Sequence, residues 1–580
     1  METMAAHGGD RVAAVLAAHG VRFVFTLCGG HISPILTASK ARGIRIIDVR
    51  DEATALFAAD AVARLTGVPG IAAVTAGPGI ANTITALKNA QLAQSPVILF
   101  AGAAPTALQG RGALQDIDQR PLVAPHVKLF RKIRRVRDLA PAVEEAFALA
   151  PAGVPGPVCI ECPVDLLYDE ASIRQWYADA AGKGSAIADR LLRFYLNRHV
   201  ERMFAAGAET TPAAQPAAAP AVSDASLEAA VAALAQAERP LLVIGSQALA
   251  IASEAPRIAA AVAQLGIPVY LSGMARGLLG RDSALQMRHQ RRQALRESDC
   301  VVLAGVPCDF RLDYGRHVRR SAKLIAANRS AKEARMNRRP DIAAIGDAGL
   351  FLQRLAAGLT PSGRRWNSWI EEVRTRDFKR EAEIEEQARP EGEFVNPIAF
   401  MRALERTAGE NAVMVADGGD FVATASYILH PRSPLSWLDP GVFGTLGVGG
   451  GFALGAALCR PESEVWIIYG DGACGYSLIE FDTFVRHGIA VIAVVGNDAG
   501  WTQIAREQVK MLHDDVGTVL ARSAYHEVAA GFGAEGILVQ HAAEVQPALA
   551  RARAAAKSGK PVLINVWLDK TDFREGSISM

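Results

Sequence analysis

Near the C-terminus, two apolar runs are each followed by residues that could hold a diphosphate and a metal ion. The run 465–469 leads into Gly-Asp-Gly-Ala at 470–473, and the run 491–495 leads into Asn497. Glycines let the backbone approach a diphosphate closely, and N–H groups at the start of a helix point at the anion. Asp471 and Asn497 supply the hard oxygen ligands that Mg²⁺ prefers. The sequence therefore predicts a magnesium–diphosphate site formed by these two turns.

A carboxylate near the N-terminus is a second candidate for chemistry. Glu52 follows the apolar run 46–49 and begins an apolar helical stretch, 52–65. Such a group can serve as a general acid or base. A negative charge at the start of a helix is also favoured by the helix dipole without any catalytic role. From the residues alone, both interpretations of Glu52 stand.

The elements that must position these residues follow a regular pattern. In each third of the chain, short apolar runs alternate with amphipathic helical stretches such as 52–65 and 80–93. This alternation is typical of parallel sheets covered by helices on both faces. No short repeat period is present, so we predict an α/β protein with three doubly wound parallel-sheet domains. The expected strands are 45–49, 71–74, 97–100 and 158–160, then 241–244, 269–271, 301–303 and 324–326, and finally 413–415, 465–469, 491–495 and 562–566.

Changes in composition predict the domain boundaries. The stretch 207–223 is rich in Ala and Pro and should form a semi-flexible connector. A polar, charged stretch from Pro361 to Glu393 should separate the second domain from the third. The expected division is a first domain 8–180, a helix and linker 181–223, a middle domain 224–357, a linker 358–393, a last domain 394–570 and a tail 571–580.

Composition excludes several classes of function. Of 580 residues, 50% are apolar and 21% charged, with a net charge of +2, so there is no electrostatic footprint for nucleic acid. No apolar run approaches the roughly 20 residues of a membrane span, and no signal-peptide pattern opens the chain. The seven scattered cysteines suit a reducing cytosol, and we expect a cytoplasmic location.

Two segments allow alternative interpretations. Cys159 and Cys162 have the spacing of a redox pair, but they lie in an extended run where positions three apart face opposite ways, so we expect core cysteines. Residues 188–205 have apolar positions at helical spacing with arginines between them. They could form a helix lying on a membrane surface, or one packed across the domains, which we favour.

Several motifs together resemble the acetolactate synthase superfamily of thiamine diphosphate enzymes, over about residues 10 to 573. Arg50-Asp51-Glu52 and the AGPGIAN segment 76–82 resemble the pyrimidine-binding motifs. The segments 417–420 and 444–447 resemble the diphosphate loop and the G-T-M-G turn, and 470–473 with Asn497 completes the cofactor signature. The first, second and third domains would then be the pyrimidine-binding, middle and diphosphate-binding domains.

The resemblance implies roles for individual residues. Glu52 would be the catalytic acid at the aminopyrimidine ring, and Leu446 the apolar wedge that keeps the cofactor bent. Gln115 matches an active-site glutamine that would stabilise a developing alkoxide. His31 could shuttle a proton near neutral pH, although an ordinary loop glutamine and a structural histidine remain alternatives. The implied cofactor-binding set is Glu52, Gly77, Asn82, Gly419, Asp420, Leu446, Gly472, Ala473 and Asn497, and the implied metal ligands are Asp471, Asn497 and Ala499.

Within the superfamily, the segment 470–477 is similar to 2-hydroxyacyl-CoA lyases and oxalyl-CoA decarboxylases, and Glu507 stands where acetolactate synthases have a substrate-pocket tryptophan. The resemblance implies a carbon–carbon lyase that cleaves 2-hydroxyacyl-CoA to an aldehyde and formyl-CoA, and that catalyses the reverse condensation. Acetolactate synthase-type decarboxylation and ligation of 2-oxoacids is the alternative. A non-catalytic subunit on this fold is disfavoured because Glu52, Asp471 and Asn497 are all retained. A Rossmann dehydrogenase is disfavoured because no G-x-G-x-x-G follows an N-terminal strand.

The same resemblance also implies which substrates, nucleotides and subunits the protein binds. The substrates would be acyl-CoA or 2-oxoacids, and the charges of CoA would need cations, for which Arg506, Lys510 and Arg574, with Arg311, are the candidates. Pro307 stands where relatives have an arginine that contacts FAD or ADP, so a middle-domain nucleotide is doubtful. In the superfamily two subunits share each cofactor, which implies a homodimer or homotetramer.

Overall fold

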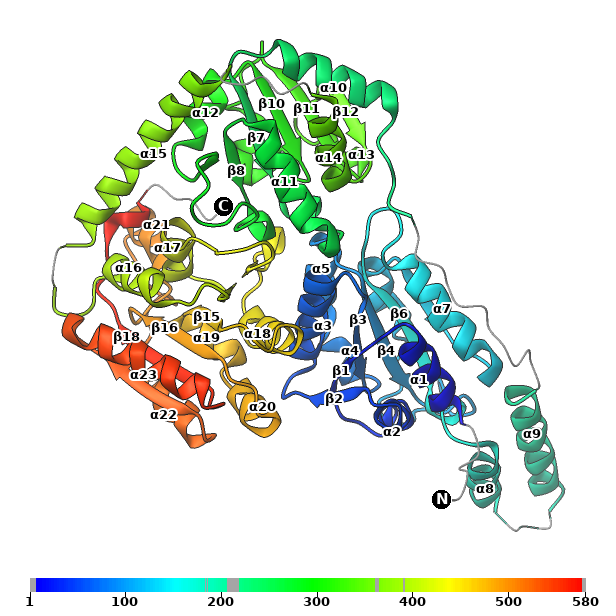
Figure 1. Ribbon diagram of the computed structural model, residues 1–580. Coiled ribbons are helices and arrows are strands. Elements are labelled where there is room, and N and C mark those ends of the chain that lie inside the picture. Colours follow the sequence, from blue (N-terminus) through cyan, green and yellow to red (C-terminus); the bar gives the residue numbers. More distant parts are fainter. Residues whose placement is uncertain are drawn as a thin grey trace. The chain divides into compact units, whose positions relative to one another are not determined.

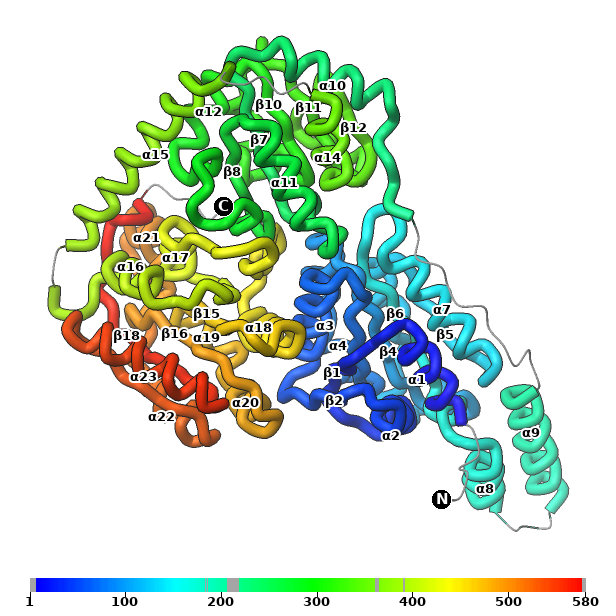
Figure 2. Tube along the Cα trace, in the orientation of Figure 1, coloured from blue at the N-terminus to red at the C-terminus, as the bar shows by residue number. Residues whose placement is uncertain are grey.

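The computed structural model describes residues 7–182, 184, 186–205, 218–359, 365–389 and 392–575. Most of the expected connector 207–223 and the end of the tail 571–580 lie outside these ranges. The chain forms two compact units, one made of residues 1–64 and 68–218 and the other of residues 219–580 with the short segment 65–67. Figure 2 follows the chain from the first unit into the second. Each unit is described by itself.

The first unit is built on a six-stranded parallel sheet in the order β2-β1-β3-β4-β6-β5. Its inner strands β3 and β4 are buried along their whole length, as expected for a sheet with helices on both faces. One face packs on α1 (Gly8–Ala18), α2 (Ser33–Ala41) and α7 (Leu139–Leu149), which share one apolar core with the strands. The strands are β1 (Phe23–Leu27), β2 (Arg45–Asp48), β3 (Gly70–Val74), β4 (Val97–Ala103), β5 (Leu129–Lys132) and β6 (Val158–Pro163); the other helices are α3 (Glu52–Thr66), α4 (Pro78–Ala81), α5 (Ile84–Leu92), α6 (Arg120–Val123), α8 (Glu170–Ala181) and α9 (Ile187–Met203).

The second unit contains two further parallel sheets, which correspond to the expected middle and last domains (Figure 1). The middle sheet has the order β12-β11-β10-β7-β8-β9. Its strands are β7 (Pro240–Ile244), β8 (Val269–Leu271), β9 (Gln286–Met287), β10 (Cys300–Ala304), β11 (Lys323–Asn328) and β12 (Ile342–Ile345); its helices are α10 (Asp224–Gln236), α11 (Ala255–Leu265), α12 (Arg291–Glu297), α13 (Ala331–Ala334) and α14 (Ala348–Gly358).

The last sheet has the order β14-β13-β15-β16-β18-β17. On one face, α16, α17 and α23 share an apolar core with the strands, and α18 covers β15 on the other. The strands are β13 (Val413–Ala416), β14 (Trp437–Leu438), β15 (Val465–Gly470), β16 (Ile492–Asn497), β17 (Glu535–Val539) and β18 (Val562–Trp567); the helices are α16 (Pro397–Thr407), α17 (Asp420–Ile428), α18 (Val448–Cys459), α19 (Asp471–Ser477), α20 (Glu480–His487), α21 (Thr502–Leu512), α22 (Tyr525–Gly531) and α23 (Val545–Lys557).

The predicted fold class is confirmed, and all twelve expected strands are present to within a few residues. Two elements differ from expectation. The stretch 80–93 is not one helix: α4 ends at Ala81, the chain turns at residues 82–83, and α5 begins at Ile84. The expected linker 358–393 is mostly helix α15 (Asn367–Gln387), whose Trp369 and Val373 pack into the core of the middle sheet. Its high charge reflects its exposed face, not a flexible chain.

The two segments with alternative interpretations differ in burial: the cysteine pair is fully buried, whereas helix α9 packs at its C-terminal end and leaves Ile187, Leu191 and Phe194 exposed. Cys159 and Cys162 lie on β6, fully buried and free, and burial raises the pKa of both thiols, so they are core cysteines. Helix α9 contacts α8, and its last turns enter the core of the first unit through Val200 and Met203. Among the described helices, none is both long and apolar enough to cross a membrane.

Candidate active site

In the first unit, the candidate residues converge because they follow neighbouring parallel strands. His31 comes after β1, Glu52 after β2, the segment 75–82 after β3 and Gln115 after β4. The carboxyl ends of parallel strands meet at one edge of the sheet, which is where doubly wound folds bind ligands. Residues far apart in the sequence are thereby brought to a single edge.

Glu52 lies at the first position of α3 and is 6% exposed. Its Oε2 accepts a hydrogen bond of 3.0 Å from the Nδ2 amide of Asn82. A Cβ placed on Gly79 would come 3.5 Å from Oε1 of Glu52. The carboxylate is therefore held by the Asn82 amide and lies at van der Waals distance from the space beside Gly79, which Thr75 restricts. Glu52 and Asn82, both implied to bind the pyrimidine ring, do lie together.

Gly77 has a structural requirement of its own. Its φ is +64°, a conformation that disfavours side chains, and a Cβ there would lie 2.8 Å from the carbonyl oxygen of Gln115. Gln115 also has a positive φ, +62°. The glycine turn and the glutamine loop are therefore packed backbone to backbone.

The two less certain candidates, His31 and Gln115, are joined through a third residue. The hydroxyl of Thr75 donates to Oε1 of Gln115 at 3.4 Å and lies 3.0 Å from Nδ1 of His31. Burial lowers the pKa of His31, which favours the neutral imidazole at pH 7. Thr75 was not identified from the sequence, where a threonine after an apolar strand carries no particular signal. It links the histidine and the glutamine into one hydrogen-bonded chain.

In the second unit, Asp471 and Asn497 end two adjacent strands. β15 and β16 pair in parallel with Gly470 opposite Gly496, so the two residues that follow are level at the sheet edge. The Asp471 carboxylate accepts hydrogen bonds from the N–H groups of Gly472, at 2.9 Å, and Gly500, at 3.0 Å. The two predicted turns are thus tied together through Asp471.

A second carboxylate, which sequence reasoning passed over, lies beside this one. Asp498 lines the same cavity as Asp471, and burial followed by the charge of Asp498 raises the pKa of Asp471 to about 7. Burial also raises the pKa of Asp498. Asp471 is buried and Asp498 partly buried, and the charge of a divalent cation bound at Asp471 would offset both carboxylates.

Asn497 and Ala499 lie just beneath this surface. Asn497 is fully buried; its Nδ2 donates to Oδ1 of Asn565 at 3.2 Å, and its Oδ1 accepts from the N–H of Ala499 at 3.3 Å. Ala499 has a φ of +56°, and its carbonyl accepts from Leu520. Neither residue lines the cavity, whereas Gly496, Asp498 and Gly500 do. The hydrogen bonds to Asn565 and Ala499 fix both ends of the Asn497 side-chain amide.

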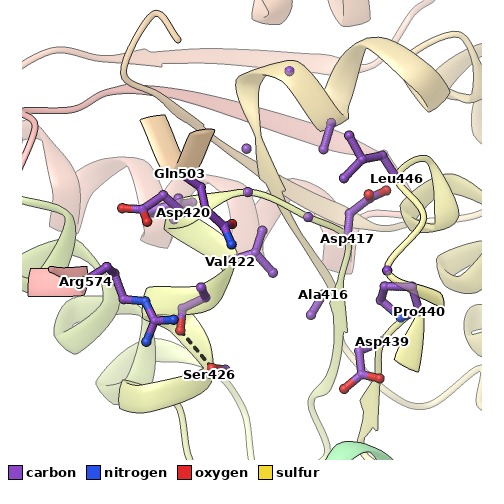
Figure 3. A pocket seen from close by; sticks show the side chains of 18 of the residues that line it. Ala416, Asp417, Asp420, Val422, Ser426, Asp439, Pro440, Leu446, Gln503 and Arg574 are labelled. Atoms are coloured by element: carbon purple, nitrogen blue, oxygen red, sulfur yellow. Dashed lines mark hydrogen bonds between the residues drawn. The ribbon is translucent and has the colours of Figure 1, made fainter. Parts of the chain in front are cut away.

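The cavity in the second unit has a volume of about 1190 Å³. Its wall includes Gly419, Asp420, Leu446, Gly472 and Ala473, five of the residues implied to bind the cofactor. Figure 3 shows Leu446 and Asp417 on one side of the cavity, and Asp420, Gln503 and Arg574 on the other. Helix α17 begins here after Gly419, whose φ is +112°, and no side chain caps its first turn. Its free N–H groups are suited to a diphosphate.

Asp417 holds the glycine turn next to Leu446. Its carboxylate accepts from the N–H groups of Gly447, at 2.9 Å, and Gly449, at 2.6 Å, and so anchors the start of α18. Complete burial raises its pKa to about 7. Leu446 in turn packs against Gly418, where any Cβ would collide with it. The sequence signal that could have identified Asp417 is an acidic residue directly after a buried strand.

Gly472 lines the cavity, and its missing side chain also makes room for Trp501, because a Cβ there would lie 2.5 Å from the indole ring. One expectation about a side chain needs correction. Arg506 was expected at a channel mouth. It is 14% exposed and lies 2.8 Å from the carboxylate of Asp420, so its charge is used inside the protein.

The other expected cations differ from one another. Lys510 is exposed on α21, and Arg574 lines the cavity with its guanidinium 4.6 Å from the centre of the Tyr427 ring. Arg311 also lines the cavity but forms an ion pair of 2.7 Å with Asp309. Of these three, only Lys510 is a surface cation.

The fold and these two half-sites define an enzyme of the thiamine diphosphate class, and family models agree. Residues 6–122 match the N-terminal thiamine pyrophosphate-binding domain of thiamine pyrophosphate enzymes, 227–355 match their central domain, and 417–566 match their C-terminal thiamine pyrophosphate-binding domain. The chain belongs to the thiamine pyrophosphate enzyme family.

Two groups of similar proteins differ in their sequence identity to this chain. The chain is 51% identical to 2-hydroxyacyl-CoA lyase 2 of Bos taurus and 50% identical to that of Homo sapiens, in each case over 99% of this chain and 92% of the relative. It is 34% identical to an acetolactate synthase large subunit of Mycobacterium tuberculosis, over 97% of this chain and 96% of the relative. The identity is therefore higher to the lyases than to the synthase.

Proposed function

We propose that this protein is a thiamine diphosphate- and Mg²⁺-dependent carbon–carbon lyase that acts on 2-hydroxyacyl-CoA. The observation that carries the proposal is its identity of about half with 2-hydroxyacyl-CoA lyases over nearly the whole chain. The reaction breaks the bond between the carbinol carbon and the thioester carbonyl and yields an aldehyde and formyl-CoA. The atoms balance without an oxidant or a second substrate, and the reverse reaction is a condensation.

The residues present fit the cofactor. The uncapped first turn of α17 offers N–H donors for a diphosphate, and the carboxylate of Asp471, with the charge of Asp498 beside it, favours Mg²⁺. We propose Asp471, Asn497 and the carbonyl of Ala499 as metal ligands; the last two would have to turn oxygens toward the ion that now accept backbone hydrogen bonds. Bound thiamine diphosphate supplies a stabilised carbanion equivalent for cleavage next to a carbonyl.

Three side chains of the first unit would act around that chemistry. Glu52, buried and bonded to Asn82, would hold a proton at the pyrimidine nitrogen. Gln115 would donate its amide hydrogens to a developing alkoxide, because its Oε1 already accepts from Thr75. Neutral His31 at the other end of this chain can accept or donate a proton near pH 7.

The substrate is tested by incubating the purified enzyme, loaded with thiamine diphosphate and Mg²⁺, separately with a 2-hydroxyacyl-CoA and with pyruvate. We expect formyl-CoA and an aldehyde from the first, detected by mass spectrometry, and inhibition of this reaction by excess free CoA. Efficient formation of acetolactate from pyruvate, with no cleavage of 2-hydroxyacyl-CoA, would replace the proposal by the synthase alternative.

Thr75→Val should lower turnover about tenfold with little effect on stability. Valine keeps the shape of threonine, against which Gly29 and Gly79 pack, but removes the bonds to His31 and Gln115. The measurement is steady-state kinetics of Thr75→Val, His31→Gln and the double variant. If the three residues act as one unit, the double variant is no slower than the slower single variant. Fully additive losses would show that Thr75 does not couple the two.

Assembly and location are also proposals. By resemblance to its superfamily, we propose a homodimer or homotetramer in the cytoplasm. The chain carries a net charge of +2, which offers no general attraction for nucleic acid. Light scattering of the holoenzyme measures the assembly directly, and a monomeric mass for a fully active enzyme would exclude it.

A further inference from the structure

A second cavity adjoins the cofactor cavity within the second unit. It has a volume of about 620 Å³ and lies between the middle sheet and the end of α17. Arg276, Arg291, Phe310, Arg311 and Ser426 line both cavities, so the two are adjacent. We call this second cavity the arginine pocket, because six arginines line it: Arg276, Arg288, Arg291, Arg292, Arg311 and Arg380.

Three of these arginines already have partners that account for them. Arg288 donates to the carbonyls of Tyr427 and Leu429 at the end of α17. Arg311 pairs with Asp309 at 2.7 Å, and Arg380 with Glu383 at 2.9 Å. The positive charges of these three arginines stabilise the protein itself and leave no uncompensated charge for a ligand.

The remaining three contact carbonyls, a ring or solvent: the Arg276 guanidinium lies 5.3 Å from the centre of the Trp437 ring, and Arg292 is exposed. Arg276 donates to the carbonyl of Ser426 at 2.7 Å, and Arg291 donates to the carbonyl of Arg311 at 2.5 Å. Among the residues that the structure describes, no carboxylate forms an ion pair with Arg276, Arg291 or Arg292.

Holding the positive charges of Arg276 and Arg291 near each other and away from water raises the free energy of the pocket unless an anion binds. Burial is the first cause that lowers the pKa of Arg276 and of Arg291, and the charge of Arg276 lowers that of Arg291 further. Asp439 offsets part of the Arg276 charge, but its carboxylate accepts from Trp437 and Gly441. Of the lining residues, Asp313 is acidic, and it lies 2.9 Å from His317. Buried cations are rarely left unpaired, so an anionic ligand would stabilise the pocket.

The rim of the pocket also offers an apolar surface. Phe310, which lines both cavities, is 54% exposed. Tyr314, on the same 3₁₀ turn (Phe310–Gly315), is 45% exposed and lines the cofactor cavity. An exposed aromatic residue beside arginines, such as Phe310, is suited to stacking on a nucleotide base.

We propose that the arginine pocket binds the 3′-phosphorylated nucleotide of the CoA substrate, with Arg276, Arg291 and Arg292 on its phosphates and Phe310 against its adenine. This rests on the proposed function, since it identifies where that substrate is held. Because the two cavities adjoin, a nucleotide held in the arginine pocket would place the thioester end of the substrate toward the cofactor cavity. A free nucleoside diphosphate carries the same chemistry, so the test must separate the two sources.

The test compares Arg291→Gln with wild type on two substrates, a 2-hydroxyacyl-CoA and the matching 2-hydroxyacyl-pantetheine, which lacks the nucleotide. We expect KM for the CoA thioester to rise about tenfold with kcat nearly unchanged, because the contact is distant from the chemistry. KM for the pantetheine thioester should not change. The matched control is Arg296→Gln, on the same helix α12 but outside the pocket, which should leave both KM values as in wild type.

Equal KM increases for both thioesters, or none for the CoA thioester, would overturn the proposal. Phe310→Ala gives the same comparison if Arg291→Gln fails to fold. Calorimetric titration of the holoenzyme with CoA and with ADP separates the ligand sources. Tenfold weaker CoA binding by Arg291→Gln supports the proposal even if wild type cleaves no 2-hydroxyacyl-CoA, an outcome that would reject the proposed function alone. ADP binding that CoA does not displace would assign the pocket to a separate nucleotide and overturn the proposal.

Discussion

Glu52→Gln should lower turnover at least about a hundredfold while the protein stays folded. Glutamine preserves the length and shape of the side chain and can still bond to Asn82, but it cannot hold a proton on the pyrimidine nitrogen as a carboxylic acid does. Losing a positioned acid or base typically costs 10²-fold or more. The measurement is kcat of the holoenzyme, with circular dichroism and thermal unfolding recorded in parallel.

The neighbouring acid provides the matched control. The Asp51 carboxylate accepts from the N–H of Ala53 at 2.7 Å and so supports the start of α3. Asn can accept the same bond, so Asp51→Asn should leave turnover close to wild type. Near-normal turnover of Glu52→Gln would remove Glu52 from the mechanism, whereas an equal loss in both variants would point to a general disturbance of the helix start.

Asp471→Ala should abolish the Mg²⁺-dependent part of thiamine diphosphate binding. The carboxylate is the one charged group among the proposed ligands, and its removal leaves the diphosphate with backbone donors but no cation bridge. It also frees the N–H of Gly500, which loosens the following loop. Calorimetric titration of thiamine diphosphate, with and without Mg²⁺, measures the effect.

An acid on the next helix is the control for this variant. Asp482, on α20, lies 2.8 Å from Arg486 and outside the cavity, so Asp482→Asn should bind the cofactor like wild type. If Asp471→Ala retains wild-type affinity for thiamine diphosphate in the presence of Mg²⁺, the loop around Asp471 is not the metal site.

The correction at Arg506 and the close packing of Trp501 on Gly472 have one physical origin. From the sequence, a cation beyond the diphosphate motif and a glycine inside it were each assigned to a ligand. In the structure Asp420 takes the charge of Arg506, and the indole of Trp501 occupies the space beside Gly472. Residue type reports what a side chain can do, but which partner it meets depends on the loops that converge around it.

The sequence by itself determined the alternation of strands and helices, the three parallel sheets and the level positions of Asp471 and Asn497. These follow from local apolar runs, from glycines in turns and from the rule that parallel strands end at one edge. Only the tertiary structure decided that Thr75 joins His31 to Gln115, that Asp498 faces the cavity with Asp471, and that Arg276 and Arg291 share a pocket without a counter-ion. Hydrogen bonds and uncompensated charges arise between loops that are distant in sequence, so the local spacing of residue types does not predict them.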